Sequence, residues 1–245
     1  MAYPGDSASH VKSLIRDRIW NQLEKQKVAR FPRPVLNRIP NFVGAEEAGM
    51  RVVSLKEFEE SRTVKVNPDA PQRQVRLETL LHRKLLLMPT PRLRSGFILL
   101  DGTLPDDRLK VASTIRGAFM LGKTVSLGRL PKIDLVVVGS VAVAKDGGRI
   151  GKGEGYSEME YAILRELELV SESTPIITTV HELQIVESVP LEDHDIAVDY
   201  IVTPTQVLAT NRTRPRPSGI FRDKVTPEMM SRMSVLKELR GRRKR

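Results

Sequence analysis

The sequence predicts a three-layer α/β fold, in which helices cover both faces of a mostly parallel sheet. Helical stretches alternate along the chain with short apolar runs rich in β-branched residues, and this alternation is typical of parallel sheets. The run KIDLVVVGSVAVA at 132–144 is apolar on both faces, as expected for a strand at the centre of such a sheet. With 245 residues, the chain can bury a full core as one large domain or two small ones.

The first third of the chain supplies helices and strands in turn. Residues 9–28 have helical spacing of apolar side chains, carried by Val11, Leu14, Ile15, Ile19 and Leu23. We expect a second helix at 44–61 and a strand at 62–66, which the breaker NPDAP ends. A helix at 72–83 with leucines on one face and a buried strand at 84–90 follow.

The remaining elements continue this order: a helix at 105–121, a short strand at 123–127, the central strand at 132–144, a helix at 157–170, strands at 174–180 and 199–203, and a last helix at 226–240. Thr226 and Pro227 are typical first residues of a helix. The stretch NRTRPRPSG at 211–219 is a basic, proline-rich linker. We therefore expect an α/β domain over 1–210, followed by a basic linker, C-terminal helix and tail over 211–245.

Most of the net charge of +10 lies at the C-terminal end. Residues 212–245 contain 12 basic and 3 acidic side chains, whereas residues 1–211 have a net charge of only +1. Such a tail is either a solvated segment that aids solubility or a surface that binds RNA. On the last helix, Met229, Met233 and Leu236 form a stripe that we expect to pack on the body of the protein.

The amino-acid composition restricts the cellular compartment of the protein and the kinds of metal site that it can contain. The chain has no cysteine, which excludes disulfides and thiolate metal sites and favours an intracellular setting. No apolar run approaches the ~18 residues of a membrane span, and the N-terminus lacks the apolar segment of a secretory signal. We therefore expect a cytoplasmic protein without a membrane partner.

One candidate phosphate site is GAFMLGKT at 117–124, which matches the P-loop pattern G-x-x-x-x-G-K-[ST]. A P-loop follows a strand and begins a helix, so that its amides and the helix dipole meet the phosphates. Here a helical stretch precedes the motif and a short strand follows. We expect Gly122 to end a helix and Lys123 to begin a strand, which disfavours the alternative of an unrelated P-loop NTPase.

A second candidate is the glycine-rich loop GGRIGKGEGY at 147–156, which follows a buried strand and precedes a strong helix. Glycines at 151, 153 and 155 let backbone amides approach an anion closely. Arg149 and Lys152 add charge-assisted hydrogen-bond donors. This context predicts phosphate binding, and a purely structural loop is the alternative.

At these residues the sequence resembles the 5-formyltetrahydrofolate cyclo-ligases, also called methenyltetrahydrofolate synthetases. Their pattern is a strand followed by the loop G-x-R-L-G-x-G-x-G-Y-Y-D. Three further stretches fit the family: ELQIVESVPLEDHDIAVDYIVTPT at 182–205, the strand RKLLLMP at 83–89 and a K-x-x-x-R pattern on the first helix. The resemblance spans about residues 8–210 and is closest to the methenyltetrahydrofolate synthetase domain-containing branch, through NFVGAEEA, KVNPDAPQ and MPTPRLRSGF.

This resemblance implies an ATP-dependent ligase of folate metabolism, with ATP and a reduced folate as its partners. Members convert 5-formyltetrahydrofolate to 5,10-methenyltetrahydrofolate with Mg²⁺ and ATP. The formyl oxygen is phosphorylated, N10 then attacks the activated carbon, and phosphate leaves. Catalysis of this kind consists mostly of positioning and charge neutralisation.

The resemblance also implies which residues form the site. Arg149 and Lys152 become the candidate catalytic residues. The candidates for holding the triphosphate are Lys12, Arg16, Gly151, Gly153, Gly155 and Tyr156. Glu158, which stands where the family has Asp, and Asp195 in the acidic turn are candidates for binding Mg²⁺, a cation that takes oxygen ligands.

The sequence also departs from the family pattern. Its Y-Y-D reads Tyr-Ser-Glu at 156–158, and Glu154 places a carboxylate among the phosphate donors. The family's E-x-x-T substrate signature is replaced by NPDAPQRQVR at 67–76. A second hypothesis therefore stays open: a non-catalytic nucleotide-binding protein that uses its basic tail on RNA.

Overall fold

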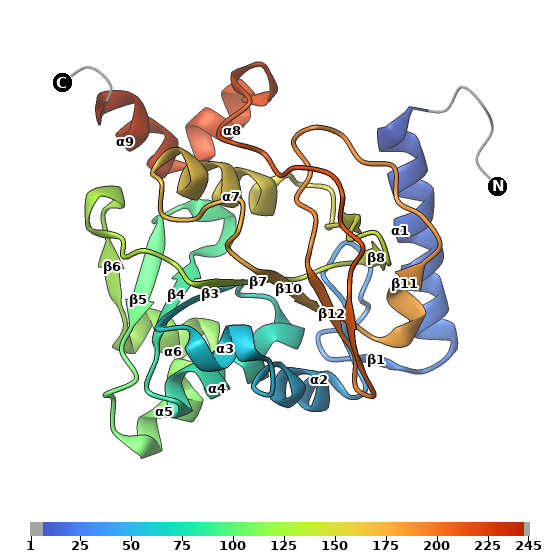
Figure 1. The fold of residues 1–245 in the computed structure, drawn as a ribbon, viewed down its shortest axis with the longest axis horizontal. Helices are drawn as coiled ribbons and strands as arrows, with labels where there is room; N and C mark the ends of the chain where they lie inside the picture. Colours follow the sequence, from blue (N-terminus) through green and yellow to red (C-terminus); the bar gives the residue numbers. More distant parts are fainter. Residues whose placement is uncertain (1–6, 243–245) are drawn as a thin grey trace.

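The computed structural model describes residues 7–242 and is built around an eight-stranded sheet (Figure 1). The strands lie in the order β13-β12-β10-β7-β3-β4-β5-β6. Their bounds are β3 Thr63–Val66, β4 Leu85–Pro89, β5 Phe97–Leu100, β6 Lys123–Val125, β7 Leu135–Val138, β10 Ile176–Thr179, β12 Tyr200–Val202 and β13 Val207–Ala209. The run from β12 to β4 is parallel, and antiparallel strands complete both edges.

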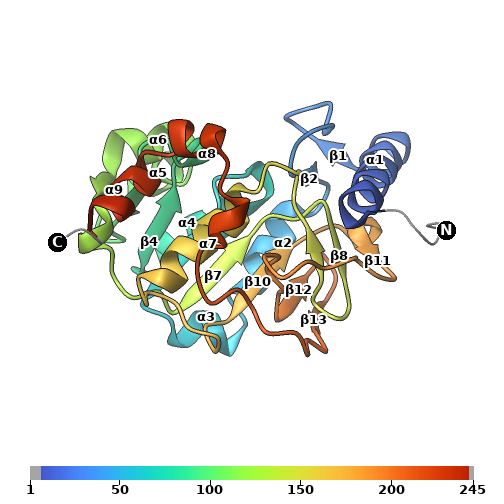
Figure 2. The ribbon, with the colours of Figure 1, turned by 90° about the horizontal axis from the view of Figure 1, so that it is seen from above.

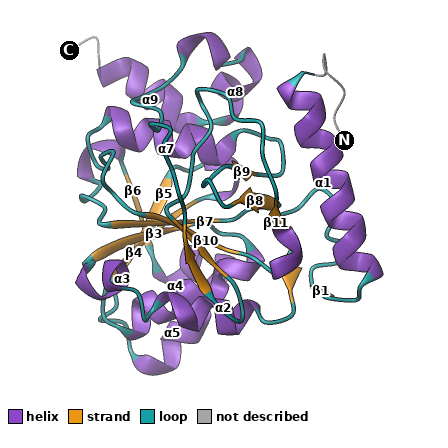
Figure 3. Cartoon of the chain, turned by 45° about the vertical axis from the view of Figure 1, so that its right-hand side comes forward, coloured by secondary structure: helices purple, strands orange, loops and turns teal. Residues whose placement is uncertain are grey.

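Helices cover both faces of this sheet (Figure 3). One face carries α2 (Ala45–Val52), α3 (Lys56–Glu60), α4 (Arg73–Leu81), α5 (Asp106–Ala112) and α6 (Ile115–Leu121), and the other carries α7 (Tyr156–Glu166), α8 (Pro227–Arg232) and α9 (Ser234–Arg242). Alternate residues of β7 face opposite layers: Val137 lies in the cluster that contains Val75 of α4, and Val136 in the cluster that contains Ile163 of α7. The predicted three-layer α/β fold is confirmed.

A smaller unit lies at one end of the central sheet, opposite the end that carries α9 (Figure 2). It combines α1 (Ala8–Lys25) with a three-stranded sheet of β8 (Ala142–Ala144), β9 (Arg149–Ile150) and β11 (Ile185–Val186). Nearby, β1 (Ala29–Arg30) pairs with β2 (Asn41–Phe42). The apolar face of α1, with Ile19, Trp20 and Leu23, shares a buried cluster with β8 and β9.

The prediction of one continuous strand at 132–144 was wrong. The chain leaves the central sheet after Val138 and enters the small sheet at Ala142. A Cβ at Gly139 would lie only 2.7 Å from Ile39 Cγ2 and 2.9 Å from Asp69 Oδ2, so the backbone turns where other groups approach closely. Gln184 secures the turn by donating a hydrogen bond to the Ser140 carbonyl at 2.8 Å.

Three predicted helices are each divided in two. The stretches 44–61, 105–121 and 226–240 contain the pairs α2 and α3, α5 and α6, and α8 and α9. In the second pair, the helix is interrupted at Thr114. The Thr114 side chain caps the new helix α6 by accepting a hydrogen bond from the Gly117 amide. Strand β5 was not predicted.

The context of the P-loop-like motif agrees with the sequence prediction. Gly122 ends α6 and Lys123 begins strand β6. The amides after Lys123 therefore enter a sheet instead of the first turn of a helix. This motif lacks the geometry that binds phosphate in a P-loop.

The C-terminal segment, residues 212–242, packs on the body of the protein. Met233 and Leu236 are buried in the same cluster as Val136, and Met229 is partly buried against that cluster, which confirms the predicted packing of the stripe. The guanidinium of Arg216 is buried and pairs with Asp199.

Several basic residues of this segment form ion pairs with carboxylates: Arg212 with Glu172, and Arg222 with Glu166. The last three basic residues, 243–245, lie outside the described part of the chain. RNA binding by the tail therefore stays a prediction. Within residues 7–242, no helix combines the length and apolarity needed to cross a bilayer.

Met233→Ala tests the contribution of the C-terminal segment to stability. The side chain is fully buried, so its truncation leaves a cavity and should lower the free energy of unfolding by about 2–5 kcal/mol. Met120→Ala is the control, because Met120 is 66% exposed and its loss should change stability by less than about 0.5 kcal/mol. Urea unfolding of both variants measures the difference, and equal stability would contradict this packing.

Candidate functional site

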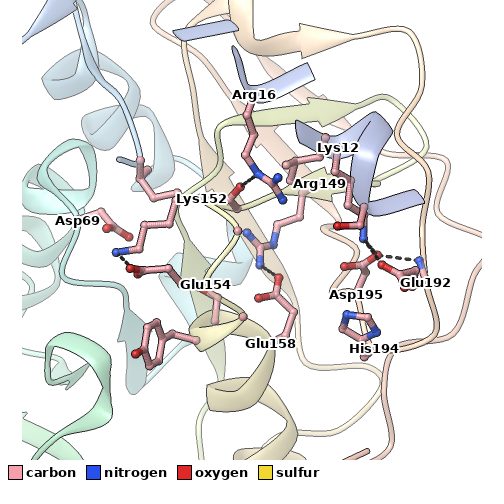
Figure 4. Close-up of a pocket in the computed structure, with 18 residues that line it drawn as sticks. Lys12, Arg16, Asp69, Arg149, Lys152, Glu154, Glu158, Glu192, His194 and Asp195 are labelled. Carbon is pink, nitrogen blue, oxygen red and sulfur yellow. Dashed lines mark hydrogen bonds and ion pairs between the residues drawn. The ribbon is translucent and has the colours of Figure 1, made fainter. Parts of the chain in front are cut away.

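A cavity of about 190 Å³ lies beside the ends of β3 and β7 (Figure 4). In the sheet, β4 lies on one side of β3, and β7, which comes later in the chain, lies on the other side of β3. The order of the strands therefore reverses between β3 and β7. Open α/β sheets bind ligands at such a switch point, outside the carboxyl ends of the strands. All ten predicted site residues line this one cavity: Lys12, Arg16, Arg149, Gly151, Lys152, Gly153, Gly155, Tyr156, Glu158 and Asp195.

Arg149 forms the floor of the site and is 1% exposed. Its guanidinium donates a 3.0 Å hydrogen bond to the Gly139 carbonyl at the end of β7, and it pairs with the Glu158 carboxylate in the first turn of α7. The Nε–H has no partner among the described residues. One buried cation therefore connects the central sheet, the glycine-rich loop and the helix that follows it.

Arg16 reaches the same loop from α1. Its Nε donates to the Gly151 carbonyl at 2.8 Å, and a Cβ at Gly153, where φ is +95°, would lie 3.2 Å from the Arg16 guanidinium carbon. Burial lowers the pKa of Arg16, and nearby carboxylates including Glu158 oppose this effect. Since no described carboxylate forms an ion pair with Arg16, its terminal N–H groups can bind an anion in the cavity.

The N-terminus of α7 faces the cavity, and residues 156–158 line it. Gly155 precedes the helix with φ of +69°, and no side chain caps the first turn. Amides in a first helical turn have no partner within the helix, and the helix dipole favours negative charge beside them. This end of α7 therefore supplies neutral hydrogen-bond donors for an anion.

Lys12 and the acidic turn, residues 192–195, form the opposite wall. The buried Lys12 ammonium donates to Asp195 at 2.5 Å and to Glu192 at 3.0 Å. Asp195 also accepts from the Glu192 amide at 2.7 Å, so it fixes the turn as well as the lysine. The hydrogen bond from Lys12 lowers the pKa of Glu192 and keeps this wall charged.

At the rim, Lys152 pairs with Glu154 at 2.6 Å, and Arg92 lies 3.4 Å from the same carboxylate. Both side chains of the Lys152–Glu154 pair are about one third exposed. The pair is therefore free to open toward a ligand. Glu154 thus places a carboxylate beside Lys152, one of the residues predicted to bind phosphate.

Asp69 lines the cavity but was not predicted as a site residue. It follows β3 in the stretch NPDAP, which ends the predicted strand and stands where the family has its E-x-x-T signature. Burial raises the pKa of its carboxyl group, while Lys152 and Arg76 oppose the shift. The side chain accepts no hydrogen bond from a described residue, although it faces the cavity beside Lys152 (Figure 4). The available signal was an acidic residue just past a buried parallel strand.

The described residues contain no group of three or more His, Asp or Glu side chains arranged to hold a metal ion. Glu158 and Asp195 line the cavity, and each already pairs with a cation. Mg²⁺ in nucleotide sites is held by one or two carboxylates together with phosphates and water, so two carboxylates suit it. The assignment of these two residues to Mg²⁺ stays a prediction.

Comparisons with known proteins place these features in a family. The model of the 5-formyltetrahydrofolate cyclo-ligase family matches residues 8–204. The methenyltetrahydrofolate synthase domain-containing proteins of Mus musculus and Homo sapiens are 47% and 45% identical to the chain, over 95% and 94% of its length. The matches cover 64% and 62% of those relatives, so the chain spans less than two thirds of their length.

The fold is also that of a solved structure. The NMR structure of the 5,10-methenyltetrahydrofolate synthetase of Aquifex aeolicus superimposes with a TM-score of 0.53 at 22% identity. The alignment covers 83% of this chain and 95% of that chain. At this identity the likeness concerns the fold alone.

Asp69→Asn should stabilise the protein near neutral pH. The folded state raises the pKa of Asp69 above its ordinary value of 3.8. As the pH rises from the pKa of the unfolded state to that of the folded state, ionisation of this carboxyl group increasingly opposes folding. The variant removes this penalty, so its melting temperature should exceed that of the wild type near neutral pH and the gain should vanish below an ordinary aspartate pKa of ~3.9. Thermal unfolding against pH measures this, with the exposed Asp223→Asn as control. Equal profiles for Asp69→Asn and the wild type would contradict the argument.

Proposed function

The chain belongs to the 5-formyltetrahydrofolate cyclo-ligase family, and we propose that it catalyses the ATP-dependent conversion of 5-formyltetrahydrofolate to 5,10-methenyltetrahydrofolate. The observation that carries the proposal is the single cavity in which α1, the glycine-rich loop and the acidic turn meet. These segments are far apart in the sequence. Each of them supplies at least one of the charged residues that the family resemblance implies for the site.

The reaction has two bond changes at the formyl group. The formyl oxygen bonds to the γ-phosphorus and ADP leaves. N10 then bonds to the formyl carbon and releases its proton to solvent, while phosphate departs with the oxygen. ATP thus supplies a leaving group for an otherwise poor electrophile. The protein has to hold the two substrates in line and neutralise the phosphate charge.

The phosphate side of the cavity is the end of α7 together with Arg16 and Lys152. The α7 amides are neutral donors, and the terminal N–H groups of Arg16 form a planar fork that suits phosphate oxygens. Lys152 reaches the phosphates once it separates from Glu154. The cavity of about 190 Å³ is smaller than the ~300–1,000 Å³ of typical ligand pockets, so both substrates require it to open further.

The balance of charge in the cavity favours binding of the nucleotide together with a metal. Four cations line it, namely Lys12, Arg16, Arg149 and Lys152, and so do five carboxylates: Asp69, Glu154, Glu158, Glu192 and Asp195. A triphosphate adds further negative charge that these cations alone do not offset. Mg²⁺ would neutralise this excess, with Glu158 and Asp195 as its protein ligands.

Asp69 lies in the segment that replaces the family's substrate signature, and it faces the cavity from the side of Lys152. A carboxylate with no hydrogen bond from the described protein is suited to accept one from a substrate N–H group. We propose that Asp69 contacts the folate. This role would explain why a carboxyl group that burial disfavours is present at this position.

Activity and nucleotide affinity test the proposal together. Purified protein with Mg²⁺, ATP and 5-formyltetrahydrofolate should form the methenyl chromophore and ADP. Lys152→Ala should weaken ATP binding about tenfold or more, because a charge-assisted contact of roughly 1.5–3 kcal/mol is lost. Lys123→Ala should stay within about twofold, because the exposed Lys123 belongs to β6.

Two outcomes separate the alternatives. ATP binding without turnover of the folate would support the non-catalytic nucleotide-binding protein. A greater loss of affinity in Lys123→Ala than in Lys152→Ala would contradict the assignment of the phosphate loop.

Glu158→Gln tests the metal assignment. Loss of one carboxylate ligand should weaken the Mg²⁺-dependent part of ATP binding by on the order of 1–3 kcal/mol. Glu166→Gln, at the other end of α7, is the comparison on the same helix. Calorimetric ATP titrations with and without Mg²⁺ measure the effect, and an unchanged Mg²⁺ dependence in Glu158→Gln would rule the assignment out.

A further inference from the structure

A chain of buried polar side chains runs beneath the cavity to Ser157. The Lys65 ammonium, on β3, is 2% exposed and donates to Glu160 of α7 at 2.7 Å. It also donates to the Asn67 side-chain oxygen. The Asn67 amide nitrogen in turn donates to Ser157 Oγ at 3.0 Å. Of these four residues, only Ser157 lines the cavity.

Lys65 fixes the orientation of the Asn67 amide. An ammonium group has hydrogens to donate and no lone pair to accept, so the group that faces it must be the amide oxygen. Asn67 is 3% exposed, and water has little access to compete for that oxygen. The NH₂ group must then point toward Ser157.

The Asn67 amide in turn fixes the direction of the Ser157 hydroxyl proton. A hydroxyl has one proton and two lone pairs, and the amide uses a lone pair. Ser157 Oγ forms no other hydrogen bond with any residue between 7 and 242. Its proton is therefore directed away from Asn67, while the residue itself faces the cavity from the first turn of α7.

We propose that the Lys65–Asn67 chain holds Ser157 as a preset hydrogen-bond donor to the phosphate group bound at the N-terminus of α7. The assignment rests on the proposed function, since it presupposes a nucleotide in this cavity. Ser157 is a binding residue in this scheme. Asn67 and Lys65 are positioning residues that act through it, and Glu160 balances the buried charge of Lys65.

The paired substitutions Ser157→Ala and Asn67→Asp test this scheme. Ser157→Ala removes the donor and should weaken binding of ATP with Mg²⁺ about tenfold. Asn67→Asp is close to isosteric, but a carboxylate only accepts, so it should turn the Ser157 proton away from the cavity and weaken binding although Ser157 is intact. The double variant should lose no more than Ser157→Ala alone, because both changes remove one contact.

Comparison of the two single variants with the double variant also distinguishes an effect of hydroxyl orientation from simple repulsion between the new carboxylate and the nucleotide. If the new carboxylate only repelled the nucleotide, the losses in the double variant would add, and the proposal would be overturned. The pair Ser157→Thr and Ser157→Val provides a second measurement that leaves Asn67 unchanged. Both new side chains are branched at Cβ and differ in the hydroxyl group. Affinity for ATP that is retained in Ser157→Thr and lost in Ser157→Val would therefore show that binding depends on the hydroxyl.

The outcomes distinguish this inference from the function on which it rests. A wild-type protein that fails to bind ATP in calorimetry contradicts the proposed function and the role of Ser157 with it. A wild-type protein that binds ATP, with equal affinity in Ser157→Ala, contradicts the role of Ser157 alone. Circular dichroism of each variant confirms that the compared proteins are folded.

Discussion

The buried guanidinium of Arg149 is the interaction on which the site depends. A charge out of contact with water is costly unless nearby groups accept its hydrogen bonds and balance it. Arg149 obtains these from the Gly139 carbonyl and the Glu158 carboxylate. The hydrogen bond to Gly139 requires β7 to end just before that residue. The ion pair with Glu158 fixes the start of α7 beside the sheet. The glycine-rich loop between them is thereby held against the cavity.

Local patterns predicted most of the elements but not their division. The apolar run at 132–144 continues through Gly139, so hydrophobicity alone gives no sign that it serves two sheets. Helical spacing likewise continues through Thr114, where a side-chain cap begins a new helix. The glycine-rich loop lies between a strand and a helix, as predicted, because that signal is local, and the structure places it at the cavity. Asp69 was missed because only the tertiary fold brings it to the cavity, whereas NPDAP in the sequence resembles an ordinary turn.

The C-terminal segment lies beyond the family match at 8–204, yet it touches two walls of the cavity. Met229 of α8 approaches Gly155, with 3.2 Å between its Cε and a Cβ built at that glycine. Phe221 packs edge-on against His194 of the acidic turn, with ring centroids 6.5 Å apart. The relatives at 45–47% identity align over nearly the whole chain, so their match reaches into this segment. Met229 and Phe221 of this segment thus pack against residues that line the cavity.

We propose that the amides at the end of α7 and in the glycine-rich loop bind the phosphates. Hydrogen exchange of the full chain, with and without Mg²⁺ and ATP, tests it most directly because it reads those amides themselves. The nucleotide should slow exchange across 151–158 and leave exchange across 117–124 unchanged. Protection of 117–124 with no change at 151–158 would contradict it.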